Sequence, residues 1–162
     1  MKIDLTFLPD EIIPDSIREL MHEEFEYPYV DEKIYAKNFL KSKRPGQEAS
    51  PPDEIREKRR ENFYRLEREL IDLGCKMKKA HKEELAEEIF KYLVEMGSKF
   101  AKPKEELVKY YQKTNNKRCM KWIVKRINDQ LRCEHVEEEN KKLKKLKKKI
   151  ETASAKKKRT KK

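Results

Sequence analysis

The chain has only three glycines among its 162 residues, and it has few runs of β-branched residues. Both scarcities argue against a β-sheet, because strands favour Val, Ile and Thr and tight hairpins favour glycine. No apolar stretch is long enough to cross a membrane, and no secretory signal is recognisable. We therefore expect an all-α protein of the nucleus or the cytoplasm with no transmembrane segment.

Cysteine is also scarce, and the three cysteines, Cys75, Cys119 and Cys133, are scattered along the chain. An odd number of isolated cysteines favours free thiols and a reducing compartment. Cys133 and His135 resemble part of a zinc site, but such a site needs about four ligands, usually in close pairs. Cys119 has no paired neighbour, so we expect no metal site.

Catalytic motifs are missing as well. The sequence has no glycine-rich phosphate loop, no nucleophile elbow and no plausible Cys/His dyad by spacing. The glutamate pairs between residues 83 and 88 lack the Glu-x-x-His motif of di-metal bundles and are interpreted as a solvated helix face. His22 and His81 are solitary and are interpreted as surface or capping residues. We expect no enzyme activity and no cofactor.

Helical periodicity fills the centre of the chain, where apolar residues recur at steps of three and four. The pattern predicts helices over residues 51–77, 82–96, 103–113 and 117–131, with Ser50 capping the first, Gly97 ending the second and Asn116 capping the fourth. Whether the first helix runs through Gly74 is left open, because an interior glycine costs about 1 kcal/mol. We predict a small antiparallel helical bundle of three to four helices with an extended N-terminal segment and a basic C-terminal tail.

The chain divides by composition into four parts: an extended or short-helix segment over residues 1–40, a linker over 41–52, a helical body over 53–140 and a lysine-rich tail over 141–162. In the first part, Asp15 and Ser16 can cap a short helix that continues to Phe25. An aromatic-rich window follows, consisting of Phe25, Tyr27, Tyr29, Tyr35 and Phe39. These rings either pack onto the helices or bind a partner protein, since aromatic residues are frequent interface anchors.

The net charge of +11 is unevenly distributed. Residues 1–40 are acidic, the body carries a small excess of basic residues, and nearly all of the remaining basic excess lies in the tail. Such a tail suits a polyanion, because binding releases condensed counterions, and lysines contact phosphates without reading sequence. The basic residues predicted here are Lys141, Lys142, Lys144, Lys145, Lys147, Lys148, Lys149, Lys156, Lys157, Lys158, Arg159, Lys161 and Lys162. The tail can equally serve as a nuclear-import signal or as a solubilising segment.

Two further basic clusters lie on predicted helices. One contains Arg56, Arg59 and Arg60 with Lys58, and the other contains Lys117, Arg118, Lys121, Lys125 and Arg126 around the single tryptophan. Arg118, Lys121 and Lys125 can share a face, and a basic face with an aromatic ring can bind RNA by backbone contacts and stacking. The alternative is that Trp122 packs at the edge of the core and its basic neighbours are merely solvated.

Together these features favour a non-catalytic structural subunit of a larger assembly whose cationic C-terminal arm binds nucleic acid, RNA more than DNA. One alternative is a cytoskeletal or ciliary protein that uses the arm on acidic tubulin surfaces. Another is a helical adaptor that binds only protein and uses its tail for nuclear import.

Overall fold

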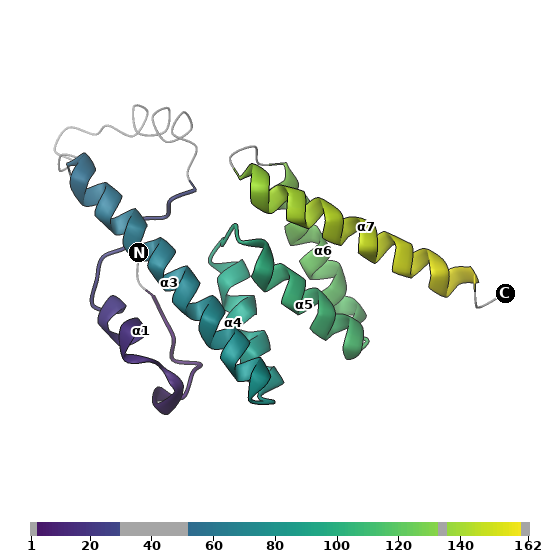
Figure 1. Ribbon diagram of the computed structural model, residues 1–162, viewed down its shortest axis with the longest axis horizontal. Coiled ribbons are helices and arrows are strands. Elements are labelled where there is room, and N and C mark those ends of the chain that lie inside the picture. The colour runs from purple at the N-terminus through teal and green to yellow at the C-terminus, as the bar shows by residue number, and fades with distance from the viewer. Residues whose placement is uncertain (1–2, 30–51, 133–135, 160–162) are drawn as a thin grey trace. The chain divides into compact units, whose positions relative to one another are not determined.

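The computed structural model describes residues 3–29, 52–132 and 136–159, with side chains up to residue 154 in the last range. Every regular element in these ranges is helical, which confirms the all-α class for the described part of the chain. The elements are the 3-10 helix η1 (Asp10–Ile12), α1 (Asp15–Leu20), α3 (Asp53–Lys79), α4 (Glu83–Glu95), α5 (Ala101–Lys113), α6 (Lys117–Leu131) and α7 (Glu137–Arg159) (Figure 1). The chain forms two compact units, Met1–Glu69 and Leu70–Lys162, and α3 contributes to both.

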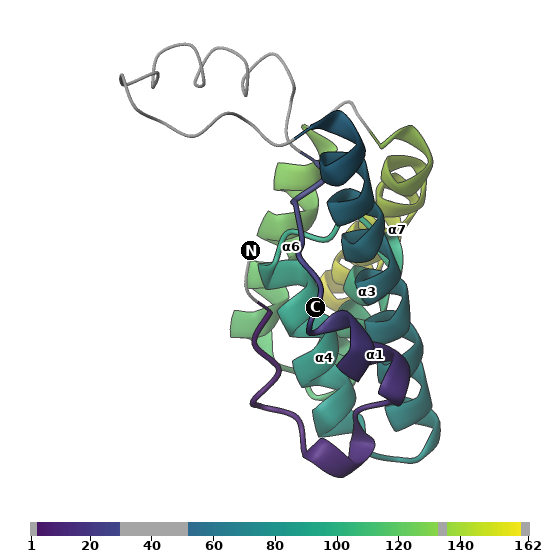
Figure 2. The same ribbon diagram turned by 90° about the vertical axis from the view of Figure 1, so that its left-hand side faces the viewer.

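In the first unit, the N-terminal segment folds back along the first part of α3 (Figure 2). Leu5 is buried beside a turn in which the Leu8 amide donates to the Leu5 carbonyl. Helix α1 ends at Leu20, earlier than expected, and has no side-chain cap. The Ser16 hydroxyl instead donates to Glu69 on α3, at 2.9 Å, and so helps to attach α1 to that helix.

Helix α3 begins at Asp53, later than the predicted start at Pro51, and it continues through Gly74. The predicted cap Ser50 lies outside the described residues. A Cβ atom at position 74 would lie 2.7 Å from the ring of Phe90 on α4, far inside normal contact. Glycine at this position therefore allows α3 and α4 to pack closely, and this packing outweighs the low helix propensity of glycine. Most of the predicted apolar stripe is buried, including Phe63 and Leu66, but Ile55 at the start of the helix is 45% exposed.

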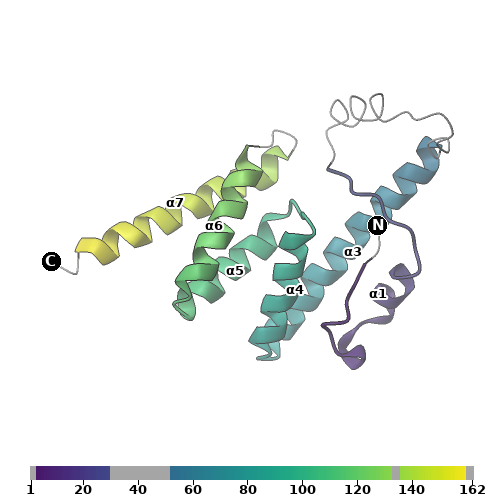
Figure 3. The same cartoon turned by 180° about the vertical axis from the view of Figure 1, so that it is seen from behind.

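In the second unit, successive helices pack against one another: α4 against α5, α5 against α6, and α7 against both α5 and α6 (Figures 1 and 3). This arrangement agrees with the expected bundle of three to four helices. The core contains Ile89, Leu93, Leu107, Ile123 and Ile127, each at most 1% exposed.

Three helices end in the second unit with the same backbone conformation. His81, Gly97 and Asn115 have positive φ angles of 59°, 89° and 52° and follow α3, α4 and α5. The amide after each of them returns to a carbonyl five residues earlier, as in a Schellman motif. The predicted ends at Gly97 and at residues 114–116 are thus confirmed, and His81 is a helix-ending residue.

The starts of α5 and α6 differ in how well the sequence predicts them. Asn116 caps α6 as expected, because its Oδ1 accepts a hydrogen bond from the Cys119 amide at 3.0 Å. Helix α5 begins at Ala101, two residues before Pro103. Helix α6 ends at Leu131 and a separate helix begins at Glu137.

Candidate nucleic-acid interface

The first part of the lysine-rich tail is an anchored helix. Leu143 of α7 is fully buried, and Leu146 and Ile150 on the same side are half-buried. The Glu139 carboxylate accepts a hydrogen bond from the Ala101 amide at the start of α5, where the helix dipole favours a negative charge. The Gln130 side chain on α6 donates to the Lys99 carbonyl, at 2.7 Å, and to Asn140 of α7, at 3.4 Å. The orientation of α7 on its unit is therefore fixed by both apolar and polar contacts.

The opposite side of α7 is a continuous cationic face. Lys141, Lys145 and Lys148 follow one another at steps of four and three, so they form one stripe along the helix. All three are exposed, as are the flanking Lys144 and Lys149. None of these five has an ion pair within the described residues, so their charges are available to a partner. We call this set the α7 lysine face.

Two of the predicted tail lysines differ from the rest. Lys142 pairs with Glu139, 2.5 Å away and one turn earlier, which raises the pKa of the lysine. Lys147 is half-buried on the packed side of the helix. The helical backbone extends to Arg159, while the side chains of Lys156, Lys157, Lys158 and Arg159, together with residues Lys161 and Lys162, lie outside the described part of the chain.

Helix α6 presents a second cationic face. Its inner side is marked by the buried residues Ile123, Ile127 and Gln130. Away from that side lie four exposed cationic residues, which we call the α6 basic face: Arg118, Lys121, Lys125 and Arg126. No ion pair involves any of the four within the part of the chain that the structure describes.

The single tryptophan belongs to the α6 basic face. At about 100° per residue, Trp122 falls closer to Arg118 and Lys125 than to the buried Ile127. Its ring is half-buried, and the Arg126 guanidinium lies 5.9 Å from the ring centroid. The sequence leaves open whether this ring packs at the core edge or shares the basic face, and the helix geometry favours the second alternative. The relevant signal is the four-residue spacing from Arg118 through Trp122 to Arg126.

The basic cluster of α3 is arranged differently. Arg56 pairs with Glu26 at 2.9 Å, Arg60 reaches the same carboxylate at 3.3 Å, and Arg59 pairs with Glu24. Burial alone raises the pKa of Glu26, but the hydrogen bonds and charges of Arg56 and Arg60 outweigh it and hold that pKa below its usual value. These arginines are used inside the first unit, so they make a poor site for an external polyanion.

The predicted aromatic window packs within the first unit as far as it is described. Phe25 is buried, and the rings of Tyr27 and Tyr29 make edge contacts with Phe63 at 5.7 and 6.4 Å between centroids. The Tyr29 hydroxyl also donates to the buried Glu67. Tyr35 and Phe39 lie outside the described residues. For Phe25, Tyr27 and Tyr29, these contacts favour packing onto the helices, and partner binding stays a prediction.

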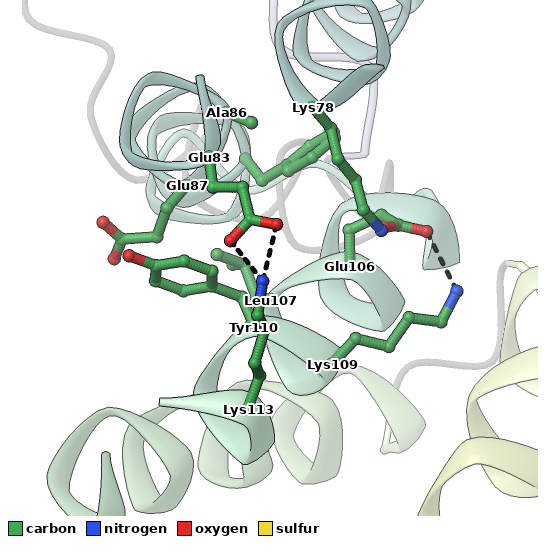
Figure 4. A pocket seen from close by; sticks show the side chains of 10 residues that line it. Lys78, Glu83, Ala86, Glu87, Glu106, Leu107, Lys109, Tyr110 and Lys113 are labelled. Atoms are coloured by element: carbon green, nitrogen blue, oxygen red, sulfur yellow. Dashed lines mark hydrogen bonds and ion pairs between the residues drawn. The ribbon is translucent and has the colours of Figure 1, made fainter. Parts of the chain in front are cut away.

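A small pocket of about 80 Å³ lies between the end of α3 and helices α4 and α5 (Figure 4). Apolar side chains, including Phe90 and Leu107, line it beneath a charged rim. Lys113 meets both carboxylate oxygens of Glu83 at 2.8 Å, and Glu87 accepts a hydrogen bond from the Tyr111 hydroxyl at 2.7 Å. The charges of this rim therefore satisfy one another, and the pocket has no charged group reserved for a ligand.

Glu106, which lines this pocket, forms ion pairs with three lysines. Its side chain is only 6% exposed, and it pairs with Lys78, with Lys102 at 3.0 Å and with Lys109 at 3.0 Å. Burial raises the pKa of Glu106, but hydrogen bonds from Lys78, Lys109 and Lys102 dominate and lower it to about 2. This cluster connects α3 to α5 within the second unit, so we assign it a role in stability.

The described residues contain no cluster of metal-ligating side chains. Cys75 and Cys119 are free and half-buried, and Cys133 and His135 lie outside the described ranges. None of the described helices combines the length and the apolar character that crossing a membrane requires.

Comparisons with known proteins found no matching family model, no matching curated protein and no matching solved structure. The α7 lysine face and the α6 basic face are therefore the features from which a function can be inferred.

Proposed function

We propose that this protein is a non-catalytic subunit of a larger assembly that binds nucleic acid through the α7 lysine face, RNA more than DNA. The observation that carries the proposal is the stripe Lys141, Lys145 and Lys148, exposed on a helix whose other side is anchored by Leu143. Anchoring matters because a helix held in place does not lose backbone freedom again when it binds.

The chemistry of this face suits a phosphate backbone. Lysine ammonium groups act as point charges that meet phosphate oxygens without the fixed geometry of a guanidinium. Such contacts supply affinity and steep salt dependence and carry little sequence information. RNA is the favoured partner because it often presents phosphates beside unpaired bases, and an aromatic ring is available on the α6 basic face.

The test is binding of a labelled oligouridylate to the full chain over a series of salt concentrations. We expect the logarithm of the affinity to fall steeply and linearly with the logarithm of salt. Replacing Lys141, Lys145 and Lys148 with Gln should make the slope shallower by about 2, since each lost contact to a single strand changes it by about 0.7.

The matched control replaces three exposed lysines elsewhere, Lys58, Lys76 and Lys91, with Gln and so changes the net charge equally. This control should leave the slope nearly unchanged. Equal effects of both variants would show that only net charge matters and would refute a site on α7. A second titration uses polyglutamate as competitor, and displacement as efficient as that by unlabelled RNA would favour an acidic protein partner instead.

A further inference from the structure

The indole of Trp122 is not among the fully buried side chains of α6. The buried side of the helix is already occupied by Ile123, Ile127 and Gln130. Trp122 points away from Ile127 and is half-buried, with Arg126 against its ring at 5.9 Å. A large aromatic side chain outside the core, among cations, is a recurrent feature of surfaces that stack bases.

The neighbours of the ring are spaced for a polyanion. Arg118 lies one turn before Trp122 and Arg126 one turn after it, while Lys121 and Lys125 lie alongside. All four cations are exposed, and within the described ranges none is neutralised by a carboxylate. The ring is therefore surrounded by charges that can bind phosphates on either side of a stacked base.

We propose that Trp122 stacks on an unpaired base of a single-stranded nucleic acid while Arg118, Lys121 and Lys125 contact the adjoining phosphates. This inference rests on the proposed function, and it adds a preference that the α7 lysine face alone does not provide. Lysines on phosphates accept single strands and duplexes alike, whereas a base inside a duplex has both of its faces covered. Arg126 gives up its place on the ring to the base and turns to a phosphate.

A membrane surface is the main competing partner for a basic helix with a tryptophan. Interfacial helices insert a broad apolar face, usually with several large apolar residues. In α6 that face is Ile123 and Ile127, which are at most 1% exposed because they form part of the core. The residues most exposed on the outer side are the cations Arg118, Lys121, Lys125 and Arg126, so the helix has no broad apolar face to insert.

Fluorescence tests the stacking directly, because the chain contains a single tryptophan. The full chain is titrated with oligouridylate, with inorganic polyphosphate and with duplex RNA, with excitation at wavelengths that tyrosine does not absorb. Anisotropy of the labelled polymers measures binding in parallel. We expect oligouridylate to quench the emission strongly, whereas polyphosphate and duplex RNA should bind with little quenching.

The outcomes separate this inference from the function on which it rests. Binding of oligouridylate without quenching, or equal quenching by polyphosphate, would refute stacking and leave the α7 proposal intact. Absence of binding by every nucleic acid would refute both. A blue shift of the emission on anionic phosphatidylserine vesicles, without quenching by oligouridylate, would assign the ring to membranes.

Two variants sharpen the result. Trp122→Leu should lower the affinity for oligouridylate by roughly 5- to 100-fold, the range for one lost base stack, and should leave duplex affinity unchanged. Trp122→Phe keeps an aromatic face and should retain most of the single-strand affinity. Because the ring is half-buried, urea unfolding of both variants checks that they are folded, and Trp122→Phe should change the urea midpoint least. Equal losses for single strand and duplex would contradict the proposal.

Discussion

The basic clusters of α3 and α6 look alike in sequence and differ in their surroundings. In α3, Arg56 and Arg60 share the carboxylate of Glu26, and Arg59 pairs with Glu24. In α6, the exposed cations have no acidic partner within the described residues, and Arg126 lies 5.9 Å from the ring centroid of Trp122. The α3 cluster belongs to the first unit and the α6 cluster to the second.

The difference shows that the number of basic residues is a poor measure of a binding surface. A paired arginine contributes to the fold, and detaching it for an external phosphate costs the pair that it already makes. An unpaired lysine on a fixed helix costs little to engage. Glu106 and its lysines give a second example of paired cations, inside the same unit as the α6 and α7 faces.

The largest predicted effect is the loss of RNA affinity when the unpaired lysines of α7 are replaced. Reversing Lys141, Lys145 and Lys148 to Glu should lower the affinity for oligouridylate on the order of 100-fold at physiological salt, because three phosphate contacts become three repulsions. Anisotropy of labelled RNA measures this, and circular dichroism checks that α7 remains helical. An affinity within a few-fold of wild type would exclude α7 from the site.

Removing paired charge should instead lower stability. Glu106→Gln should reduce the free energy of unfolding at neutral pH by about 1–3 kcal/mol, because three lysines lose their common negative charge and one of its two acceptor oxygens becomes an NH2 donor. The pKa of Glu106 lies at about 2 in the folded protein, below its ordinary 4.5. The carboxylate therefore stabilises the fold above pH 4.5, and this contribution is lost as the pH falls towards 2.

Urea unfolding at several pH values checks the Glu106 prediction. The free energies of wild type and Glu106→Gln should differ most near neutral pH and converge as the pH approaches 2. A difference that stays constant over this range would show that the charge of Glu106 is not the cause. RNA affinity at neutral pH should be unchanged as long as the variant is folded.

Neutralising three of the four cations of the α6 basic face should weaken RNA binding without a loss of stability. Arg118→Gln, Lys121→Gln and Lys125→Gln together should lower single-strand affinity roughly tenfold at physiological salt, as expected for three lost phosphate contacts on a second surface. The urea midpoint should stay the same or rise, since unpaired like charges repel each other. A lowered midpoint with unchanged affinity would reverse our assignment of this face.

The smallest effect is expected for the α3 cluster. Arg56→Gln, Arg59→Gln and Arg60→Gln together should change RNA affinity less than about twofold, the size of a change in net charge alone. Stability should fall by up to about 1 kcal/mol for each lost pair, as is usual for partly exposed ion pairs. Urea unfolding and anisotropy on the same preparation separate the two quantities.

The local features of the fold follow well from the sequence. The cap at Asn116 and the end of α4 before Gly97 are each specified by residues next to one another in the chain. The passage of α3 through Gly74 could not be predicted, because its reason is the ring of Phe90, sixteen residues further along.

The candidate site was predictable only in part. The lysine spacing on α7 identifies a cationic face, but the anchoring of that helix depends on Glu139 and Leu143 meeting other helices. The sequence gives equal weight to the arginines of α3 and the cations of α6, because the neutralising residue Glu26 lies thirty residues before Arg56. Pairing over such distances is set by tertiary structure.

The most direct test compares the two clusters with equal changes in charge. The triple variants Arg56/Arg59/Arg60→Gln and Arg118/Lys121/Lys125→Gln are measured side by side for the salt dependence of oligouridylate binding. We predict a slope shallower by about 2 for the α6 variant and an unchanged slope for the α3 variant. Equal slopes in the two variants, or a larger change for α3, would contradict the claim that unpaired cations form the site.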